Sequence, residues 1–567
     1  MRRIKNLILP LILFLAFTIR VVGISSYPVG FTQDEAALGY DAYSLLETGK
    51  DQWGNSWPLV LRSFGDFKMP LYSYLAIPSI GIFGLNEFAT RLPSAIIGTL
   101  AVLATYLMCR QILKDIKFGI WNLEFGILPA FLLAISPWHI SLSRGAFEAN
   151  LTTFFIPLGI WLYFLGIEKP KYLIFSALAF GLNLFSYHSA RIFTIMLISV
   201  LLILNWREVK QLFINNFKKV LPTIAVFGVF LILLVNSLFA GSGRRASDVT
   251  IFNPTDKWAA VSDRRYEAVL LGMPSEIARI FSNKVSYIFH RITSNYLSYL
   301  SPDFLFTEGV SEWSYGMIPG RGVLYTLEFI PILFGVAFYL KGKGHKNMKL
   351  LLLWVIFAPI PAALSKGPGH SGTRAAVLMP AIQILSAYGI VSGLNFVKSR
   401  FFSFATYNLG LLIVLGFYLV SLTFFFEDYR YHSNVRGAKL MQYGMRETLE
   451  FIESIEDNYS EILLSRSLSV PNIWVQFYLK VDPVQVQEAT KQWVAYEKQG
   501  YVSIDQMSQY SLGKYTFSGI DKEGLAKEKG VLVVGKPYEF KDGQKVLKTI
   551  YYPDKTPAYV IVDSEEM

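Results

Sequence analysis

Long apolar runs alternate with short polar segments along most of residues 1–426. Several runs approach the length of about 20 residues with which an α-helix crosses a bilayer. They lie at roughly 6–25, 88–110, 121–138, 148–167, 172–187, 190–205, 220–240, 322–340, 350–365, 375–397 and 403–426. This pattern predicts an α-helical polytopic membrane protein with about 11 transmembrane helices. The apolar segment Leu71–Phe83 is too short to span, so we expect an interfacial or re-entrant helix there.

The basic residues support one topology for these spans. With the N-terminus in the cytoplasm, the inner loops are 111–120, 168–171, 206–219, 341–349 and 398–402, and each carries Lys or Arg. Such an excess of positive charge is typical of cytoplasmic loops. An odd number of spans then places the C-terminus outside the cytoplasm. Two large outer loops follow, at 26–87 and 241–321.

The segment 427–567 is polar enough to form a domain of its own outside the membrane. Met441–Glu456 has the periodicity of an amphipathic helix. Short β-branched runs predict strands at Glu461–Leu464, Gly530–Val534, Val546–Tyr552 and Ala558–Val562. We therefore expect a GT-C-like transmembrane domain over 1–426, as argued below, and an extracytoplasmic α/β domain over 427–567.

Composition excludes several classes of protein. Hydrophobic residues make up 53% of the 567 residues and charged residues only 17%, whereas soluble domains contain about 25% charged residues. The net charge of +11 is explained by the cytoplasmic loops, so no nucleic-acid partner is expected. The single cysteine, Cys109, excludes an intramolecular disulfide and a cysteine-based metal cluster. The sequence contains no Walker A, GxGxxG or HExxH motif, which leaves an ATP-driven machine unsupported.

Ionisable and polar residues gather at the outer ends of the predicted spans, where they are candidates for function. They are Asp34 and Glu35; Asp66 and Lys68; His139, Arg144 and Glu148; Tyr187, His188 and Arg191; Arg244 and Arg245; and His370 and Arg374. Acids and bases from six outer segments can converge on one cavity. That arrangement suits a phosphorylated substrate held in the membrane at its outer leaflet.

Each candidate in the first outer loop also has a structural interpretation. Asp34 and Glu35 can supply a base or metal ligand and a loop anchor, or they can cap the helix predicted from Ala36 onward. Lys68 can bind a phosphate, or its side chain can extend to the membrane interface.

The later candidates have alternatives of the same kind. Arg144 and Glu148 are spaced to pair on one helix face, either at the site or as a structural ion pair. Tyr187, His188 and Arg191 can belong to the site or to a polar turn between two spans. His370 and Arg374 follow a Gly/Pro-rich loop that can bind anions through backbone N–H groups.

The order of motifs resembles the GT-C membrane glycosyltransferases of family 39. These motifs are Asp34-Glu35, Lys68-x-Pro-Leu-Tyr-x-Tyr-Leu75 and Ile82-Phe-Gly-x-x-Glu-Phe-Ala-x-Arg-Leu-Pro-Ser-Ala95, and the resemblance is strongest over residues 30–200. The family includes protein mannosyltransferases and lipid A aminoarabinose transferases. Lys68-Met-Pro70 departs from the Lys-Pro-Pro of the aminoarabinose branch, and the C-terminal segment matches neither branch clearly.

The resemblance implies an inverting transfer of a sugar from a polyprenyl-phosphate donor at the outer face of the cell membrane. The acceptor would be a protein or an envelope glycan or lipid. Asp34 would be the catalytic base, with Glu35 beside it, and Lys68, Arg144, Arg191 and Arg374 would bind the donor phosphate. Glu148, Tyr187, His188 and His370 would contact other parts of the substrates. No cofactor is certain, and a divalent metal held by Asp34 with another outer acid or histidine stays open.

Three other functions are weighed against this hypothesis. A transporter or flippase would place charges at the bilayer midplane and show internal repeats, and neither is visible in the sequence. A lipid-linked oligosaccharide ligase would use the large loop 241–321 for its donor. An envelope scaffold would bind partners through 427–567 and would not need Asp34.

Overall fold

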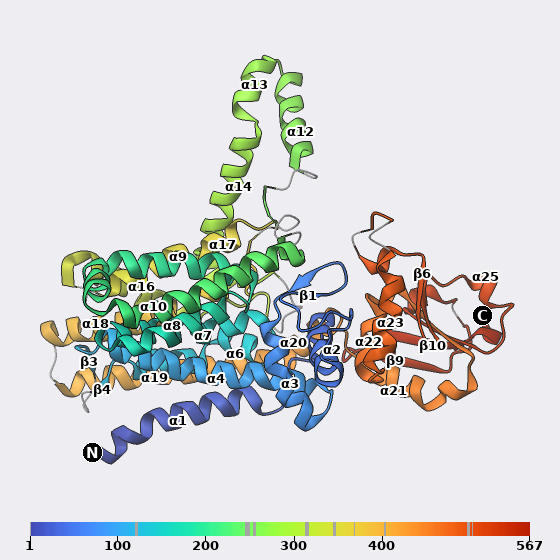
Figure 1. Cartoon of the computed structure of the whole chain (residues 1–567), viewed down its shortest axis with the longest axis horizontal. Helices are drawn as coiled ribbons and strands as arrows, with labels where there is room; N and C mark the ends of the chain where they lie inside the picture. Colours follow the sequence, from blue (N-terminus) through green and yellow to red (C-terminus); the bar gives the residue numbers. More distant parts are fainter. Residues whose placement is uncertain are drawn as a thin grey trace.

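The protein is described by a computed structural model over residues 2–118, 123–243, 250–252, 257–311, 317–343, 347–367, 369–401, 404–495, 499–501, 503–541 and 543–567. A bundle of helices with similar directions forms its main body (Figure 1). A sheet domain at the C-terminal end of the chain lies at one end of this bundle, and the N-terminus lies at the other. The expected membrane domain with a C-terminal sheet domain is confirmed.

The helices of the bundle follow the predicted apolar runs. They are α1 (Arg2–Val21), α4 (Glu87–Ile112), α5 (Ile127–Ile135), α6 (Pro137–Ser143), α7 (Thr152–Glu168), α8 (Leu173–Asn183), α9 (His188–Leu204), α10 (Trp206–Ser237), α15 (Phe329–Phe338), α16 (Met348–Phe357), α17 (Pro359–Ala363), α18 (Ala381–Phe401) and α19 (Phe404–Glu427). Five helical segments within the described residues are long and apolar enough to span a membrane, and four shorter apolar ones accompany them. The predicted number of 11 spans is not confirmed.

Proline explains why two of the predicted spans are each broken into two helices. The run 121–138 contains α5 and the start of α6, which are separated at Ser136 before Pro137. The run 350–365 contains α16 and α17, with Pro359 as the first residue of the second helix. Proline lacks the N–H that a helix interior needs and is favoured at a first helical position. The predicted pattern of hydrophobicity therefore locates the spans but not their breaks.

The first outer loop folds into short elements at the end of the bundle that carries the sheet domain (Figure 1). Helix α2 spans Gln33–Thr48, the two-residue strands β1 and β2 are Leu61–Arg62 and Phe67–Lys68, and helix α3 is Leu71–Phe83. Helix α3 confirms that the short apolar segment is helical. In the second loop, α12 (Lys257–Leu270), α13 (Ser275–Phe281) and α14 (Lys284–Tyr299) project from the side of the bundle.

The C-terminal domain is built on a six-stranded sheet in the order β6-β7-β5-β8-β10-β9. Its strands are β5 (Glu461–Ser465), β6 (Gln509–Leu512), β7 (Tyr515–Ser518), β8 (Val531–Gly535), β9 (Lys548–Tyr551) and β10 (Pro557–Asp563). Strand β5 runs parallel to β7 and β8, and the other pairs are antiparallel. The four predicted strands and the amphipathic helix, α21 (Met445–Ile455), are confirmed. The hairpin β6–β7 was not predicted, because its alternation is short and polar.

The sheet domain packs directly on helix α2 through its own helix α22 (Pro471–Tyr478). The rings of Phe31 and Phe477 lie 4.9 Å apart, and the Tyr40 hydroxyl donates to the Val481 carbonyl at 2.6 Å. Buried residues of α2, α3 and the sheet domain form one continuous hydrophobic core. The C-terminal domain therefore helps to hold the helix that carries Asp34.

Candidate functional site

The first turn of α2 gives Asp34 and Glu35 opposite environments. Thr32 is the N-cap of α2: its hydroxyl accepts from the Glu35 N–H at 3.1 Å, and the Glu35 carboxylate accepts from the Thr32 N–H at 3.0 Å. This reciprocal capping box fixes the start of the helix and directs Glu35 inward. Asp34, one position earlier, keeps a carboxylate that is 41% exposed. Adjacent acids therefore have different tasks.

Glu35 forms a fully buried ion pair with Arg91 of α4. The Arg91 Nε lies 2.7 Å from Glu35 Oε1, and both side chains are 0% exposed. The same guanidinium donates to the backbone carbonyls of Ile24, Pro28 and Gly30. A buried charge is tolerated when it is paired and its hydrogen-bonding capacity is satisfied. Glu35 and Arg91 therefore fasten the first outer loop to the bundle, and we propose that Glu35 positions Asp34.

Asp34 pairs with Lys68, which lies on the short strand β2. Asp34 Oδ1 and Lys68 Nζ are 3.0 Å apart, and the lysine side chain is only 3% exposed. Lys68 also donates to the Ser63 hydroxyl at 2.6 Å and lies over the Phe64 ring at 4.6 Å. A buried ammonium is held here beside a carboxylate that solvent can reach. This pair joins an acid and a cation from the two predicted motifs of the first loop.

Hydrogen bonds connect the Lys68 strand to three further outer segments. The Phe67 carbonyl lies 2.9 Å from His188 Nε2 at the start of α9. The Met69 N–H donates to Glu148 at 2.9 Å. Tyr187, next to His188, donates to the Thr373 hydroxyl at 3.5 Å. Glu148, Tyr187 and His188 are thus brought to the neighbourhood of Lys68, as the sequence predicted.

The three predicted phosphate-binding arginines have structural contacts of their own. Arg144 donates to the backbone carbonyls of Ile19 and Tyr27. Arg191 donates to the Leu184 carbonyl and to two serine hydroxyls of the segment after α10. Arg374 donates to the Lys366 carbonyl at 2.7 Å. Their role toward a donor phosphate stays a prediction.

The expected pairing of Arg144 with Glu148 on one helix is wrong in its geometry. Helix α6 ends at Ser143, and a separate 3₁₀ turn begins at Glu148. The intervening Gly145 is packed so that a Cβ atom would lie 2.1 Å from the Phe147 ring. The chain therefore turns between the two residues instead of continuing as a helix.

The remaining predicted residues lie apart or outside the described part of the chain. His370 stacks on Phe304, with ring centres 5.6 Å apart. His139 is buried, 2.7 Å from Arg20 and 3.0 Å from Thr153, so it belongs to the interior of the bundle. Arg244 and Arg245 lie outside the described residues.

A further acid, Asp41, was missed by the sequence analysis although it follows Asp34 by two turns of α2. It is 1% exposed, it accepts from the Gln52 N–H at 3.1 Å, and its Oδ2 has no hydrogen-bond partner among the described residues. Burial, with the nearby Asp51 carboxylate, raises the pKa of Asp41 well above its ordinary value, while Lys68 opposes this rise. The spacing of seven residues was the available signal.

We expect Asp41 to make stability depend on pH. Because the folded protein keeps this proton to a higher pH than the unfolded chain does, the free energy of unfolding falls as pH rises from the ordinary pKa of aspartate through the raised one. Asp41→Asn keeps the shape and removes the titration, so its melting temperature should fall less over that range. Thermal unfolding of both proteins over a pH series measures this. Equal slopes would exclude a raised pKa at Asp41.

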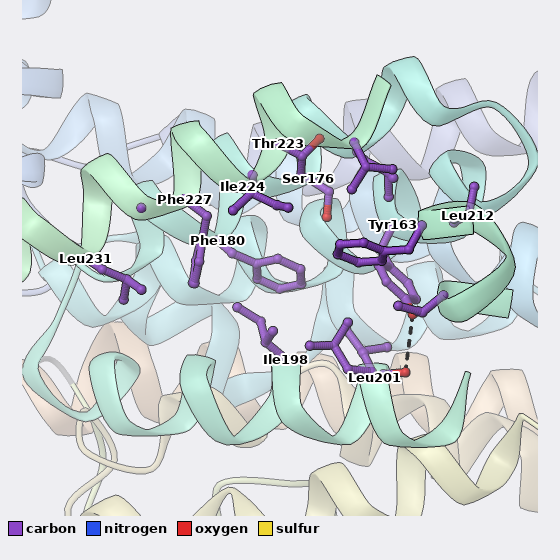
Figure 2. Close-up of a pocket in the computed structure, with 17 residues that line it drawn as sticks. Tyr163, Ser176, Phe180, Ile198, Leu201, Leu212, Thr223, Ile224, Phe227 and Leu231 are labelled. Carbon is purple, nitrogen blue, oxygen red and sulfur yellow. Dashed lines mark hydrogen bonds between the residues drawn. The ribbon is translucent and has the colours of Figure 1, made fainter. Parts of the chain in front are cut away.

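An apolar cavity of about 330 Å³ lies among α7, α8, α9 and α10. Figure 2 shows Phe180, Ile198, Ile224 and Phe227 around it, and the Tyr163 hydroxyl donates to the Leu201 carbonyl at 3.3 Å. Its lining is almost entirely hydrocarbon. The cavity therefore suits an alkyl or isoprenoid chain and offers little to a phosphate.

One group among the described residues has the spacing of metal ligands, namely Glu427, Asp428 and His432 at the end of α19. Asp428 pairs with Arg321, and Glu427 lies 2.9 Å from His432. These contacts already balance much of the charge. At Asp34, a divalent cation would have to displace the Lys68 ammonium, so the geometry favours an anion there.

The comparisons with known proteins follow this geometry. Residues 68–238 match the family model described as dolichyl-phosphate-mannose-protein mannosyltransferase. No curated protein matches the chain in sequence.

Three solved structures are similar to the chain. ArnT from Cupriavidus metallidurans bound to undecaprenyl phosphate has a TM-score of 0.54 and 11% identity, over 97% of each chain. Its apo form has a TM-score of 0.52 and 11% identity, over 98% of this chain and 97% of that one. The apo oligosaccharyltransferase of Archaeoglobus fulgidus has a TM-score of 0.48 and 14% identity, over 98% and 74%.

The family match and the structural match cover complementary parts of the chain. The family model spans the segment that carries Lys68, Arg91, Arg144 and Glu148. The ArnT structures extend over nearly the whole chain, including the sheet domain, and show the fold. The chain is therefore a GT-C family protein.

Proposed function

We propose that the protein is an inverting glycosyltransferase that uses a polyprenyl-phosphate-linked sugar as donor. The acceptor is a protein or an envelope glycan or lipid at the outer face of the membrane. The observation that carries this proposal is the pair formed by Asp34 and Lys68, 3.0 Å apart. The family match over 68–238 supports it, and so does the undecaprenyl phosphate named for the similar ArnT structure.

The pair has the chemistry that such a transfer needs. As the bond between the anomeric carbon and the phosphate oxygen breaks, the phosphate gains negative charge, which an ammonium stabilises. The acceptor hydroxyl forms the new bond to the same carbon and loses its proton to a carboxylate. We assign the first task to Lys68 and the second to Asp34. The apolar cavity of Figure 2 can receive part of the isoprenoid chain.

The 3.0 Å contact also suggests how the site responds to its donor. Without a donor, Lys68 and Asp34 neutralise each other. A phosphate carries more charge than one carboxylate and competes for the ammonium. Lys68 then turns toward the phosphate, and the Asp34 carboxylate becomes available to the acceptor hydroxyl.

Lys68→Ala should weaken use of the donor by about ten- to a hundredfold, because a charge-assisted hydrogen bond contributes about 1.5–3 kcal/mol. KM for a polyprenyl-phosphate sugar, measured on the purified full-length protein beside its melting temperature, tests this. Lys50→Ala is the control, since Lys50 is an exposed lysine of the same loop. A lower melting temperature with an unchanged KM would exclude Lys68 from the phosphate site.

We also propose that the site and the sheet domain face away from the cytoplasm. Cys109 is buried, so introduced thiols can be labelled against a low background. An impermeant thiol reagent added to intact cells should modify a cysteine placed at exposed Ser56 and should not modify one at exposed Lys171. Labelling at position 171 from outside would contradict this orientation.

A further inference from the structure

A second, polar cavity lies between the first outer loop and the sheet domain. It has a volume of about 490 Å³. One wall is the segment 25–30 after α1, together with Glu87 at the start of α4. The other wall is formed by the sheet domain, mainly by residues 442–450 at the start of α21. None of the residues that line it was predicted for the catalytic site.

An ion pair joins the two walls of this cavity. Arg446 of α21 donates through Nε to Glu87 Oε1 at 2.7 Å. Glu87 is 8% exposed and Arg446 is 46% exposed, so the guanidinium borders the open space. Burial of the nearby Tyr478, with the Glu87 carboxylate, raises the pKa of that tyrosine well above its ordinary value, so its hydroxyl stays a hydrogen-bond donor. The two walls are thus held at a fixed separation.

The chemistry of the lining selects among ligands. Three carboxylates, from Glu87, Glu447 and Glu450, face one guanidinium, from Arg446. Lys548 lies 3.3 Å from Glu447 and partly offsets its charge. A surplus of carboxylates repels phosphates and other anions. It accepts hydrogen bonds from hydroxyl and ammonium groups.

Aromatic and amide side chains complete the lining. Tyr27, Tyr443 and Tyr478 contribute rings, and Asn434 and Gln442 contribute amides. The Asn434 amide accepts from the Val29 N–H at 3.2 Å, which ties it to the same wall as Tyr27. Rings with an apolar face and a polar edge, set beside carboxylates and amides, match the alternating C–H and O–H faces of a sugar.

We propose that this cavity binds a carbohydrate without phosphate, neutral or bearing an amine, as part of the acceptor. The proposal rests on the proposed glycosyl transfer and adds the chemical class of the acceptor. Gly30 of the cavity wall accepts from Arg91 at 2.7 Å, and Arg91 holds Glu35 beside Asp34. A sugar in the cavity therefore contacts the same loop that carries the base.

Direct binding to the full-length protein tests this without any turnover. The probes are mannose, N-acetylglucosamine and glucosamine, with glucose 6-phosphate as an anionic probe and a Ser/Thr-rich peptide as an alternative acceptor. Saturation-transfer NMR measures binding to the wild type and to Glu450→Gln and Tyr443→Leu. Glu453→Gln is the control, since it removes the same charge from exposed α21 surface outside the cavity lining.

We expect at least one phosphate-free sugar to bind, and Glu450→Gln to weaken it by about tenfold, as the loss of one charge-assisted hydrogen bond predicts. Glu453→Gln and the catalytic variant Asp34→Asn should bind as the wild type does. The proposal is overturned if none of the phosphate-free sugars binds, if the cavity variants bind them unchanged, or if only the peptide or the sugar phosphate binds. Loss of turnover in Asp34→Asn with sugar binding intact would keep the two proposals separate.

Discussion

Asp34→Asn should abolish sugar transfer and leave the fold intact. The amide keeps the shape of the side chain but cannot accept the acceptor's proton, and loss of a general base costs about 10²- to 10⁴-fold in rate. The carboxylate is 41% exposed, and an ion pair open to solvent adds little to stability, about 0–1 kcal/mol. The measurements are turnover with a polyprenyl-phosphate sugar and the melting temperature of the same preparation.

The matched control for this variant is Glu47→Gln, because Glu47 is an exposed acid on the same helix. It should transfer sugar at the wild-type rate. Turnover by Asp34→Asn near that rate would remove Asp34 from the mechanism. An envelope scaffold or a transporter would also show no dependence on this carboxylate.

Arg91→Met should produce the largest loss of stability. The substitution leaves the Glu35 carboxylate buried without its partner, and breaking a buried pair costs about 3–5 kcal/mol. It also strips three backbone carbonyls of the loop of their donor. Thermal unfolding in detergent or nanodiscs measures the shift, and the variant is expected to be recovered in low yield.

Arg110→Met supplies the comparison on the same helix, α4. Arg110 pairs with Glu124 at 3.2 Å, but the two side chains are 58% and 35% exposed, so its removal should cost less than about 1 kcal/mol. Equal effects of the two substitutions would show that the Glu35–Arg91 pair does not fasten the loop.

Features governed by local sequence were predictable. The capping motif at Thr32 and Glu35 anticipated the start of α2, and the short run Leu71–Phe83 became α3 with the same bounds. The breaks before Pro137 and Pro359 were missed because a hydropathy pattern counts apolar residues and ignores missing backbone donors.

Features that depend on long-range packing were not predictable. Arg91 was read only as part of a motif, yet it is the partner of Glu35, 56 positions away. Conversely, Arg144 and Glu148 were expected to pair because of their spacing, but the chain turns after Ser143. Sequence spacing predicts contacts within one helix and cannot tell which loops the tertiary fold brings together.

The joint between the two domains was also beyond the sequence. The Gln33 amide donates to the Ser469 hydroxyl at 3.3 Å, which places a loop of the sheet domain next to Asp34. No periodicity or motif in 427–567 signals that contact. It makes the C-terminal domain a neighbour of the site and not a separate appendage.

The most direct test of the central claim is an experimental structure of the full-length protein with a bound polyprenyl phosphate. The account predicts phosphate density within hydrogen-bond distance of Lys68 Nζ, with the Asp34 carboxylate released and open to solvent. Phosphate density at a distant position, with the contact between Asp34 and Lys68 unchanged, would contradict it.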